Sequence, residues 1–314
     1  WVSSVDYSAD VPIGAGILRQ LADVYRKVRN TSRYLLGNLH DFNPAADSIP
    51  VADLPLLDRW MLQRTAEVMD EITTAFESYE FFRFFQLLQN YCVTDLSNFY
   101  LDIAKDRLYV NAPADRRRRS CQTVMALIIE RLAGLISPVL CHMAEDIWQN
   151  LPYSVGEVSV FQRGWPTVPQ EWRDDKLSAP VQELRDLRAA VNKVLEECRS
   201  RQELGASLES AVRIEARKPE LKSALDWLRD NGDVEVDGLR DWLLVSQLQL
   251  GGEPWAELLA SQDDAIAVIE VSRARGIKCD RCWHYEGDVG QHPGHATVCG
   301  RCVGILDRRT HQRA

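Results

Sequence analysis

The stretch Cys279-Asp280-Arg281-Cys282, answered by Cys299-Gly300-Arg301-Cys302, decides the fold of the last part of this chain. Two Cys-x-x-Cys pairs separated by 16 residues can present four thiolates to one tetrahedral Zn²⁺. The interval between them is rich in Gly and Pro, as a tight loop requires. Because a segment this short cannot build an apolar core of its own, bound metal would supply its folding free energy.

A site of four thiolates is closed, which leaves no position for water or substrate. We therefore expect a structural zinc ion, and the closed shell argues against a zinc-dependent enzyme. Two alternatives stay open: a redox role for either Cys-x-x-Cys pair alone, or replacement of one cysteine by a histidine of the interval (His284, His292, His295). The other cysteines lie in apolar, helical-looking sequence and are expected to be buried free thiols: Cys92, Cys121, Cys141 and Cys198.

Arg281 lies between the first two predicted ligands, and Trp283 follows the second. A guanidinium and an indole on a rigid turn suit contact with phosphate and stacking on an unpaired base. Alternatively, Trp283 packs over the metal and Arg281 is solvated. The residues alone leave both interpretations open.

The composition is that of an ordinary globular chain, with 314 residues of which 46% are hydrophobic and 26% charged. No apolar run approaches the roughly 18 residues of a membrane span. The net charge of −9 argues against indiscriminate coating of nucleic acid. Residues 273–314 carry eight Lys/Arg and four Asp/Glu, a net of +4, so the remainder carries −13. This asymmetry suits an anionic partner that is gripped at chosen places.

Apolar spacing upstream predicts a mainly α fold. Residues 17–39 form an amphipathic helix in which Arg26, Arg29 and Arg33 share a separate face. Further helices are expected over residues 54–78, 81–109, 117–151 (broken at Pro138) and 177–202. The dense aromatic residues of 81–109 are interpreted as core packing.

After Gly205 the pattern changes to a small α/β unit. Strands are expected over residues 211–216, 243–245 and 266–271, with a short helix over 221–230. The predicted division is a junction tail (1–16), a helical bundle (17–152), a connection with a long helix (153–204), the α/β unit (205–275) and a zinc-binding domain (276–314).

The densest basic run is Arg116-Arg117-Arg118-Arg119, at the start of a predicted helix. Such a run is usually a solvated face, but four positive charges there oppose the helix dipole, which leaves phosphate contact as an alternative. No phosphate-binding glycine loop, HIGH-type or KMSKS-type signature or nucleophile constellation is present, so no catalytic residue is predicted.

Several motifs, in order along the chain, resemble the anticodon-binding part of bacterial class I isoleucyl-tRNA synthetases. They are Arg29-Asn30-Thr31-Ser32-Arg33-Tyr34, Leu57-Asp58-Arg59-Trp60, Phe99-Tyr100-Leu101-Asp102, Ala144-Glu145-Asp146-Ile147-Trp148 and Val191-Asn192-Lys193-Val194. The resemblance covers essentially the whole chain. The bundle motifs are partly shared with valyl and leucyl relatives, whereas Lys278-Cys279-Asp280-Arg281-Cys282-Trp283 favours the isoleucyl family.

The resemblance implies that the intact enzyme attaches isoleucine to its tRNA with ATP and edits mischarged valyl-tRNA. It further implies that the zinc unit helps to hold the anticodon loop through Arg281 and Trp283. By analogy, the helix with Arg26, Arg29 and Arg33 faces the anticodon stem.

We expect isoleucine tRNA as partner, one structural Zn²⁺ as cofactor, a monomer and a cytoplasmic location. Catalysis and ATP binding are expected in an N-terminal part absent from this sequence, which makes the chain a fragment or a truncated product. The alternatives are a free-standing, non-catalytic tRNA-binding or scaffold protein, or the equivalent region of a valyl or leucyl relative.

Overall fold

The computed structural model describes residues 1–233 and 237–311, with side chains as far as residue 307. The chain forms two compact units. The bundle unit consists of Trp1–Ala104 and Pro113–Asp174, and the sheet unit consists of Lys105–Ala112 and Asp175–Ala314. The finer five-part division drawn from the sequence stays a prediction.

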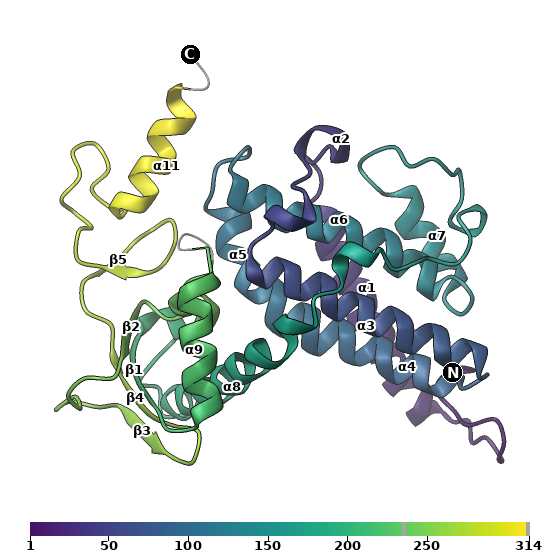
Figure 1. Cartoon of the computed structure of the whole chain (residues 1–314), viewed down its shortest axis with the longest axis horizontal. Coiled ribbons are helices and arrows are strands. Elements are labelled where there is room, and N and C mark those ends of the chain that lie inside the picture. The colour runs from purple at the N-terminus through teal and green to yellow at the C-terminus, as the bar shows by residue number, and fades with distance from the viewer. Residues whose placement is uncertain (234–236, 312–314) are drawn as a thin grey trace. The chain divides into compact units, whose positions relative to one another are not determined.

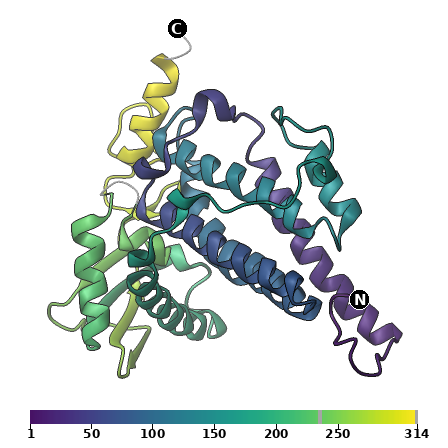
Figure 2. The same cartoon turned by 45° about the vertical axis from the view of Figure 1, so that its right-hand side comes forward.

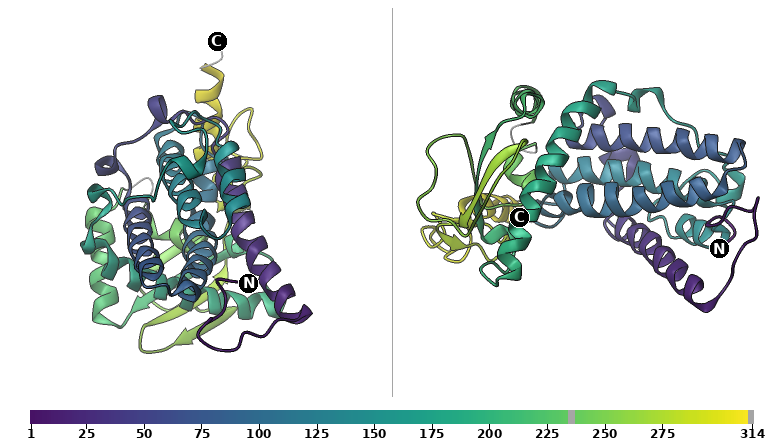
Figure 3. Two further views of the ribbon diagram at one scale, coloured as in Figure 1. Left: turned by 90° about the vertical axis from the view of Figure 1, so that its right-hand side faces the viewer. Right: turned by 90° about the horizontal axis from the view of Figure 1, so that it is seen from below.

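Helices make up the bundle unit, and its long helices run side by side (Figures 1 and 3). In chain order they are α1 (Ala15–Gly37), α2 (Pro44–Asp47), α3 (Leu56–Glu77), α4 (Phe81–Asn90), α5 (Leu101–Tyr109), α6 (Arg116–Ile136) and α7 (Cys141–Gln149). Short 3-10 turns lie at Val51–Asp53, Val160–Gln162 and Gln170–Trp172. Across the described residues, no helix combines the length and the apolar character needed to cross a membrane.

The predicted amphipathic helix is α1, which buries Val28 and Leu35 and leaves its arginines exposed. The centre of the bundle is α3, which buries residues on nearly every side. Even its Asp58 is fully buried, where the carboxylate accepts a hydrogen bond of 2.6 Å from the Tyr100 hydroxyl. A buried carboxylate needs such a partner.

The helix predicted over residues 81–109 is not uniform. Between α4 and α5 the backbone is a π-helix, η2 (Tyr91–Tyr100), and residues 105–109 of α5 already belong to the sheet unit. Core packing of the aromatic residues is confirmed for Phe84, Tyr91, Phe99 and Tyr100, which are buried. Apolar spacing over ten residues does not separate a π-helix from an α-helix, so the pattern predicts only a continuous helix here.

A break at Pro138 is confirmed, because α6 ends at Ile136 and α7 begins at Cys141. Proline lacks the N–H donor that would continue the helical ladder. The other end of α6 is capped by Asp115, whose carboxylate accepts a hydrogen bond of 2.9 Å from the Arg117 backbone N–H. This cap offsets part of the repulsion between the helix dipole and the basic run.

The sheet unit combines a four-stranded sheet with helices and a small two-stranded ribbon (Figures 1 and 2). The sheet order is β2-β1-β4-β3, with β1 and β2 parallel and the other pairs antiparallel. The elements are α8 (Ser178–Ser200), β1 (Ser210–Ala216), α9 (Pro219–Asn231), α10 (Leu239–Leu243), β2 (Gln247–Leu250), β3 (Ala260–Asp263), β4 (Ala267–Arg273), β5 (Ile277–Lys278), β6 (Tyr285–Glu286) and α11 (Gly300–His311). Two 3-10 turns lie at Asp175–Leu177 and Ser207–Glu209.

Alternation along the strands gives this sheet two unlike faces. Val212 and Ile214 are buried on the face that packs against α8 and α9, opposite Val271 and Ile269 of β4. The other face carries a buried ion pair in which the Arg213 guanidinium donates to Glu270 at 2.7 and 2.9 Å.

One predicted strand is wrong. Residues 243–245 instead end α10 and turn through Leu244 at a φ of 57°, and β2 begins only at Gln247. The apolar residues Trp242, Leu243 and Val245 are buried from a helix end and a turn, which a short apolar run cannot distinguish from a strand.

Candidate metal centre and nucleic-acid interface

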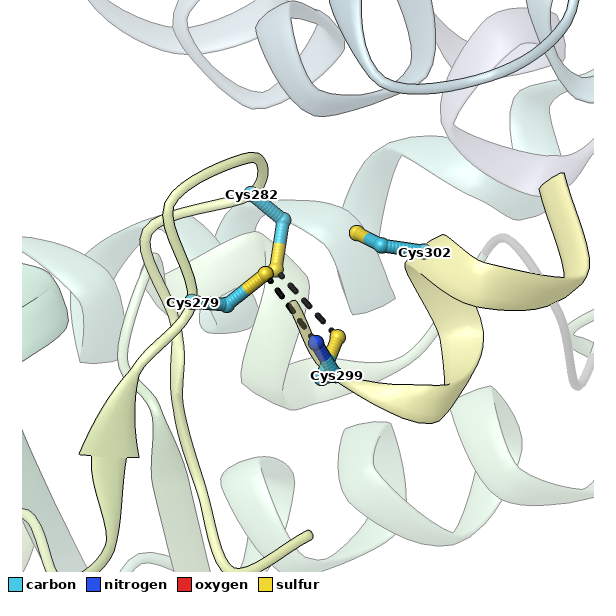
Figure 4. Close-up of side chains that lie close together, drawn as sticks. All are labelled: Cys279, Cys282, Cys299 and Cys302. Atoms are coloured by element: carbon cyan, nitrogen blue, oxygen red, sulfur yellow. Dashed lines mark hydrogen bonds between the residues drawn. The ribbon is translucent and has the colours of Figure 1, made fainter. Parts of the chain in front are cut away.

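Two local structures present the four cysteines of the last segment, residues 276–307, called here the zinc segment. Cys279 and Cys282 lie in the turn between β5 and β6, and Cys299 and Cys302 lie at the start of α11 (Figure 4). The Cys279 N–H donates to the His284 carbonyl at 2.9 Å, and the Trp283 N–H donates to the Cys279 carbonyl at 2.9 Å. These bonds close the first knuckle and direct both sulfurs inward.

The four sulfur atoms all lie within 4.8 Å of one another, and the four residues are buried. The Sγ atoms of Cys282 and Cys299 are 3.7 Å apart. Zinc–sulfur bonds of about 2.3 Å in a tetrahedron place the sulfurs about 3.8 Å from one another, so this cluster fits a zinc ion. The Cys299 N–H also donates to the Cys279 sulfur at 3.3 Å, which links the two knuckles directly.

Crowding of the thiols perturbs their protonation. Hydrogen bonds from Cys282 and Cys302 lower the pKa of Cys299 to about 3, whereas hydrogen bonds with Cys282 and Cys299 raise the pKa of Cys302. The first thiolate therefore opposes ionisation of its neighbours. A divalent cation at the centre of the cluster removes this conflict and allows all four sulfurs to ionise.

Histidine takes no part in the metal cluster within the described residues, so the alternative with a histidine ligand is not favoured. His284 is buried, and its pKa is lowered by burial and by the charge of Arg240. His292 lies 3.0 Å from the Asp288 carboxylate, and His295 lies 3.8 Å from Asp307. The shell of four cysteines is closed, as a structural zinc site requires.

The zinc segment has a small core that includes residues from far earlier in the chain. Val289, Val298 and Ile305 form a cluster with the cysteines, and Val110 and Ala112 pack into it. The Arg301 guanidinium donates two hydrogen bonds of 2.8 Å to the Asp106 carboxylate. No sequence pattern predicts this anchor, because Asp106 and Arg301 are 195 residues apart.

Arg281 is half-buried, and its guanidinium donates to the Val110 carbonyl at 2.5 Å. Its Nε is buried and has no hydrogen-bond partner among the described residues. Trp283, in contrast, is 61% exposed, and its backbone adopts a φ of 66°. A left-handed conformation costs a non-glycine residue about 1 kcal/mol or more. The Lys278 ammonium lies 5.6 Å from the centre of the Trp283 ring. The indole therefore faces solvent from a strained turn instead of covering the metal.

In the bundle unit, α1 carries the predicted basic face. Arg26, Arg29 and Arg33 are exposed and recur at helical spacing on the side away from Val28 and Leu35. Arg26 pairs with Asp23 one turn earlier. Guanidiniums arranged in this way can reach successive phosphates of a nucleic-acid backbone.

The basic run at the start of α6 is not simply a solvated face. Arg118 is buried and donates two hydrogen bonds, of 2.6 and 2.8 Å, to the Asp41 carboxylate. Arg119 donates to the Asp41 backbone carbonyl at 2.9 Å. Burial opposes ionisation of Asp41, but the bonds from Arg118 and Gln122 outweigh it and lower the pKa to about 2. These two arginines therefore serve the bundle itself.

Residues 58–215, half of the chain, match the family model described as the anticodon-binding domain of tRNA ligase. The chain belongs to this family. Residues 276–303 match a second model, described as a zinc finger found in FPG and IleRS. The predicted structural zinc is confirmed by this match together with the four-cysteine cluster.

Relatives along the whole chain agree with this assignment. The isoleucine–tRNA ligase of Parasynechococcus marenigrum (strain WH8102) is 85% identical over 312 residues, which are 99% of this chain and 32% of that protein. The isoleucine–tRNA ligases of Prochlorococcus marinus strains MIT 9313 and MIT 9301 are 78% and 55% identical over 98% of this chain. The chain spans about a third of the length of these curated relatives. The family resemblance inferred from the sequence is confirmed.

Proposed function

We propose that this chain is the tRNA-recognition part of an isoleucine–tRNA ligase and binds the anticodon stem-loop of isoleucine tRNA. The observation that carries this proposal is the match of residues 58–215 to the anticodon-binding domain of tRNA ligases. A relative that is 85% identical bears the name isoleucine–tRNA ligase, which supports isoleucine tRNA as the partner.

The exposed face of α1 supplies the contacts to the anticodon stem in this proposal. Neither Arg29 nor Arg33 has a carboxylate partner among the described residues, so their charges are available to phosphates. Arg26 can exchange its pairing with Asp23 for a phosphate, since an exposed ion pair contributes little. Such contacts fix the position of the stem but do not read its sequence.

The zinc segment supplies the contact to unpaired bases. The exposed indole of Trp283 offers a flat surface for stacking, and the Arg281 fork lies two residues before it. Bound zinc would hold Cys279, Cys282, Cys299 and Cys302 together and so keep the Trp283 turn rigid. A rigid platform loses little conformational entropy when a base stacks on it.

The chemical steps belong to the rest of the longer protein in this proposal. Attachment of isoleucine with ATP, and editing, would take place outside these residues, and we assign no catalytic residue to them. The recognition part would act in the cytoplasm as part of a monomeric enzyme.

Binding of the chain to isoleucine tRNA and to the same tRNA with a swapped anticodon tests the proposal. Affinity should fall at least tenfold on the swap, across a salt series, because base contacts are lost while phosphate contacts remain. Replacing Arg29 and Arg33 by Gln should weaken the binding of both tRNAs by the same factor. The exposed Phe161→Ala variant, which lies in neither surface, is the matched control for Trp283→Ala.

Equal affinity for both tRNAs, with a steep salt dependence, would contradict anticodon recognition by this chain. It would instead support a passive nucleic-acid-binding part that needs the rest of the enzyme for specificity.

A further inference from the structure

A groove of about 1030 Å³ opens within the sheet unit, on the polar face of the four-stranded sheet. Its floor includes Gln249 and Ser272, and one wall is the loop of residues 253–259 with Trp255. The opposite wall is the segment that leaves β4, with Arg273 and Arg275. This volume is at the upper end of that of small-ligand sites, enough for a nucleotide with its flanking phosphates.

Hydrogen bonds to the floor fix the two walls in place. The Trp255 ring N–H donates to the Gln249 amide oxygen at 3.0 Å, and its backbone N–H donates to Glu270 at 3.0 Å. Across the groove, the Gln247 amide donates to the Arg275 carbonyl at 2.9 Å and accepts from its N–H at 3.0 Å. Glu270 is itself held by the buried Arg213. The groove is therefore pre-formed, as a binding site requires.

Arginines mark the groove out from the rest of the surface. Most arginines of this acidic chain pair with a carboxylate or a carbonyl. Among the side chains that the structure describes, exposed arginines whose guanidinium makes no hydrogen bond or ion pair lie in two places only. One is α1, with Arg19, Arg29 and Arg33, and the other is this groove wall, with Arg273 and Arg275. Two unpaired guanidiniums at one groove attract a phosphate.

The wall formed by residues 253–259 is negatively charged, in contrast to the arginine wall. Glu253 and Glu257 are exposed there, with Trp255 and Leu258 beside them. The groove thus offers cations on one side, carboxylate acceptors on the other and an aromatic ring between. A nucleotide has the matching sequence of groups: an anionic phosphate, a flat base, and hydroxyl or amino donors.

We propose that this groove binds one unpaired nucleotide of the tRNA, with its phosphate on Arg273 and Arg275 and its base against Trp255. This inference rests on the proposed function, since it names a further contact of the same partner. The residues of this site are different from those of the Trp283 knuckle and of α1. A free mononucleotide has the same phosphate and base as a nucleotide of tRNA, so the test distinguishes the two ligands.

The test compares the double variant Arg273→Gln/Arg275→Gln with Arg217→Gln/Arg229→Gln in the full chain. Both remove two exposed positive charges from the sheet unit, but Arg217 and Arg229 already pair with Asp263 and Asp226. For isoleucine tRNA, the slope of log K against log salt should fall by roughly two in the groove variant, and by less than one in the control. Photocrosslinks from tRNA carrying 4-thiouridine should map to residues 253–259 and vanish in the groove variant. Equal thermal unfolding midpoints establish that both variants fold.

Wild-type slope and crosslinks in the groove variant would overturn the inference. So would loss of binding to adenosine or uridine monophosphate with unchanged tRNA binding, which would assign the groove to free nucleotides. The proposed function fails separately: if swapping the anticodon changes nothing while the groove variant still loses slope, anticodon recognition is wrong and the groove stands. If the anticodon swap weakens binding but the groove variant keeps the wild-type slope, anticodon recognition stands and the groove inference is wrong.

Discussion

Different interactions stabilise the bundle unit and the zinc segment, although both belong to the same chain. In the bundle, α3 alone fully buries Leu57, Met61 and Ile72, and burial of apolar area on that scale stabilises a fold without help. The zinc segment packs only a few side chains around its cysteines and borrows Val110 and Ala112 from far upstream. A core this small needs a metal. Burial of apolar side chains stabilises the bundle as a scaffold. Bound metal would instead stabilise a compact turn that can expose a strained residue.

Removing the metal should give the largest effect and break this comparison most directly. Chelation, or Cys299→Ser, removes an apparent contribution on the order of 10 kcal/mol in structural zinc sites. Hydrogen exchange should then show loss of protection in residues 277–306 while α3 and α6 stay protected. Cys141→Ser is the control, because Cys141 lies outside the cluster and is exposed; the prediction that it is a buried thiol is wrong. Unchanged protection in a zinc-free chain would mean that the small core suffices.

Next in size is the ion pair that the bundle adds to its apolar core. Arg118→Met leaves the Asp41 carboxylate half-buried without its bidentate partner and should lower the free energy of unfolding by about 2–4 kcal/mol. Urea unfolding of the bundle measures this loss. The exposed Arg19→Met variant should change stability by under about 0.5 kcal/mol. A neutral Arg118→Met would show that apolar burial alone sets the stability of this unit.

Trp283→Gly separates display from structure in the zinc segment. Glycine adopts the left-handed turn without strain. The zinc-bound segment should therefore be more stable by about 1 kcal/mol, measured as the free energy of zinc binding. Binding of tRNA should weaken by about 1–3 kcal/mol, because the stacking surface is gone. Trp283→Phe should keep much of the binding. A variant that loses zinc more easily would instead indicate that the indole packs on the metal site.

The smallest expected effect is on the stability of the bundle at acidic pH. The pKa of Asp41, lowered to about 2 by Arg118 and Gln122 against the cost of burial, gives a stabilisation fully present above about pH 4. It is lost as the pH falls through the folded-state pKa. In Asp41→Asn this part of the pH dependence should be absent when unfolding of the bundle is followed between pH 5 and 2. Parallel curves for both proteins would show that other carboxylates dominate.

Local patterns predicted much of this molecule because their causes are local. The helical spacing of α1, the break at Pro138 and the strand pattern of residues 211–216 each follow from the period of apolar side chains or from the missing proline donor. The two Cys-x-x-Cys pairs predicted the metal cluster, because their spacing alone brings four thiolates together. The resemblance to the isoleucyl family added the partner and the expected roles of Arg281 and Trp283.

Tertiary structure alone decided the rest. Whether Arg118 is solvated or buried depends on Asp41, 77 residues away, and the anchoring of the zinc segment depends on Asp106, 195 residues from Arg301. The groove beside Arg273 exists only because a loop and a strand end meet over one face of the sheet. A sequence pattern reports the preference of a segment for its own conformation. It does not report which distant charge will face a side chain, and that pairing determines whether an arginine stabilises the fold or is available to a partner.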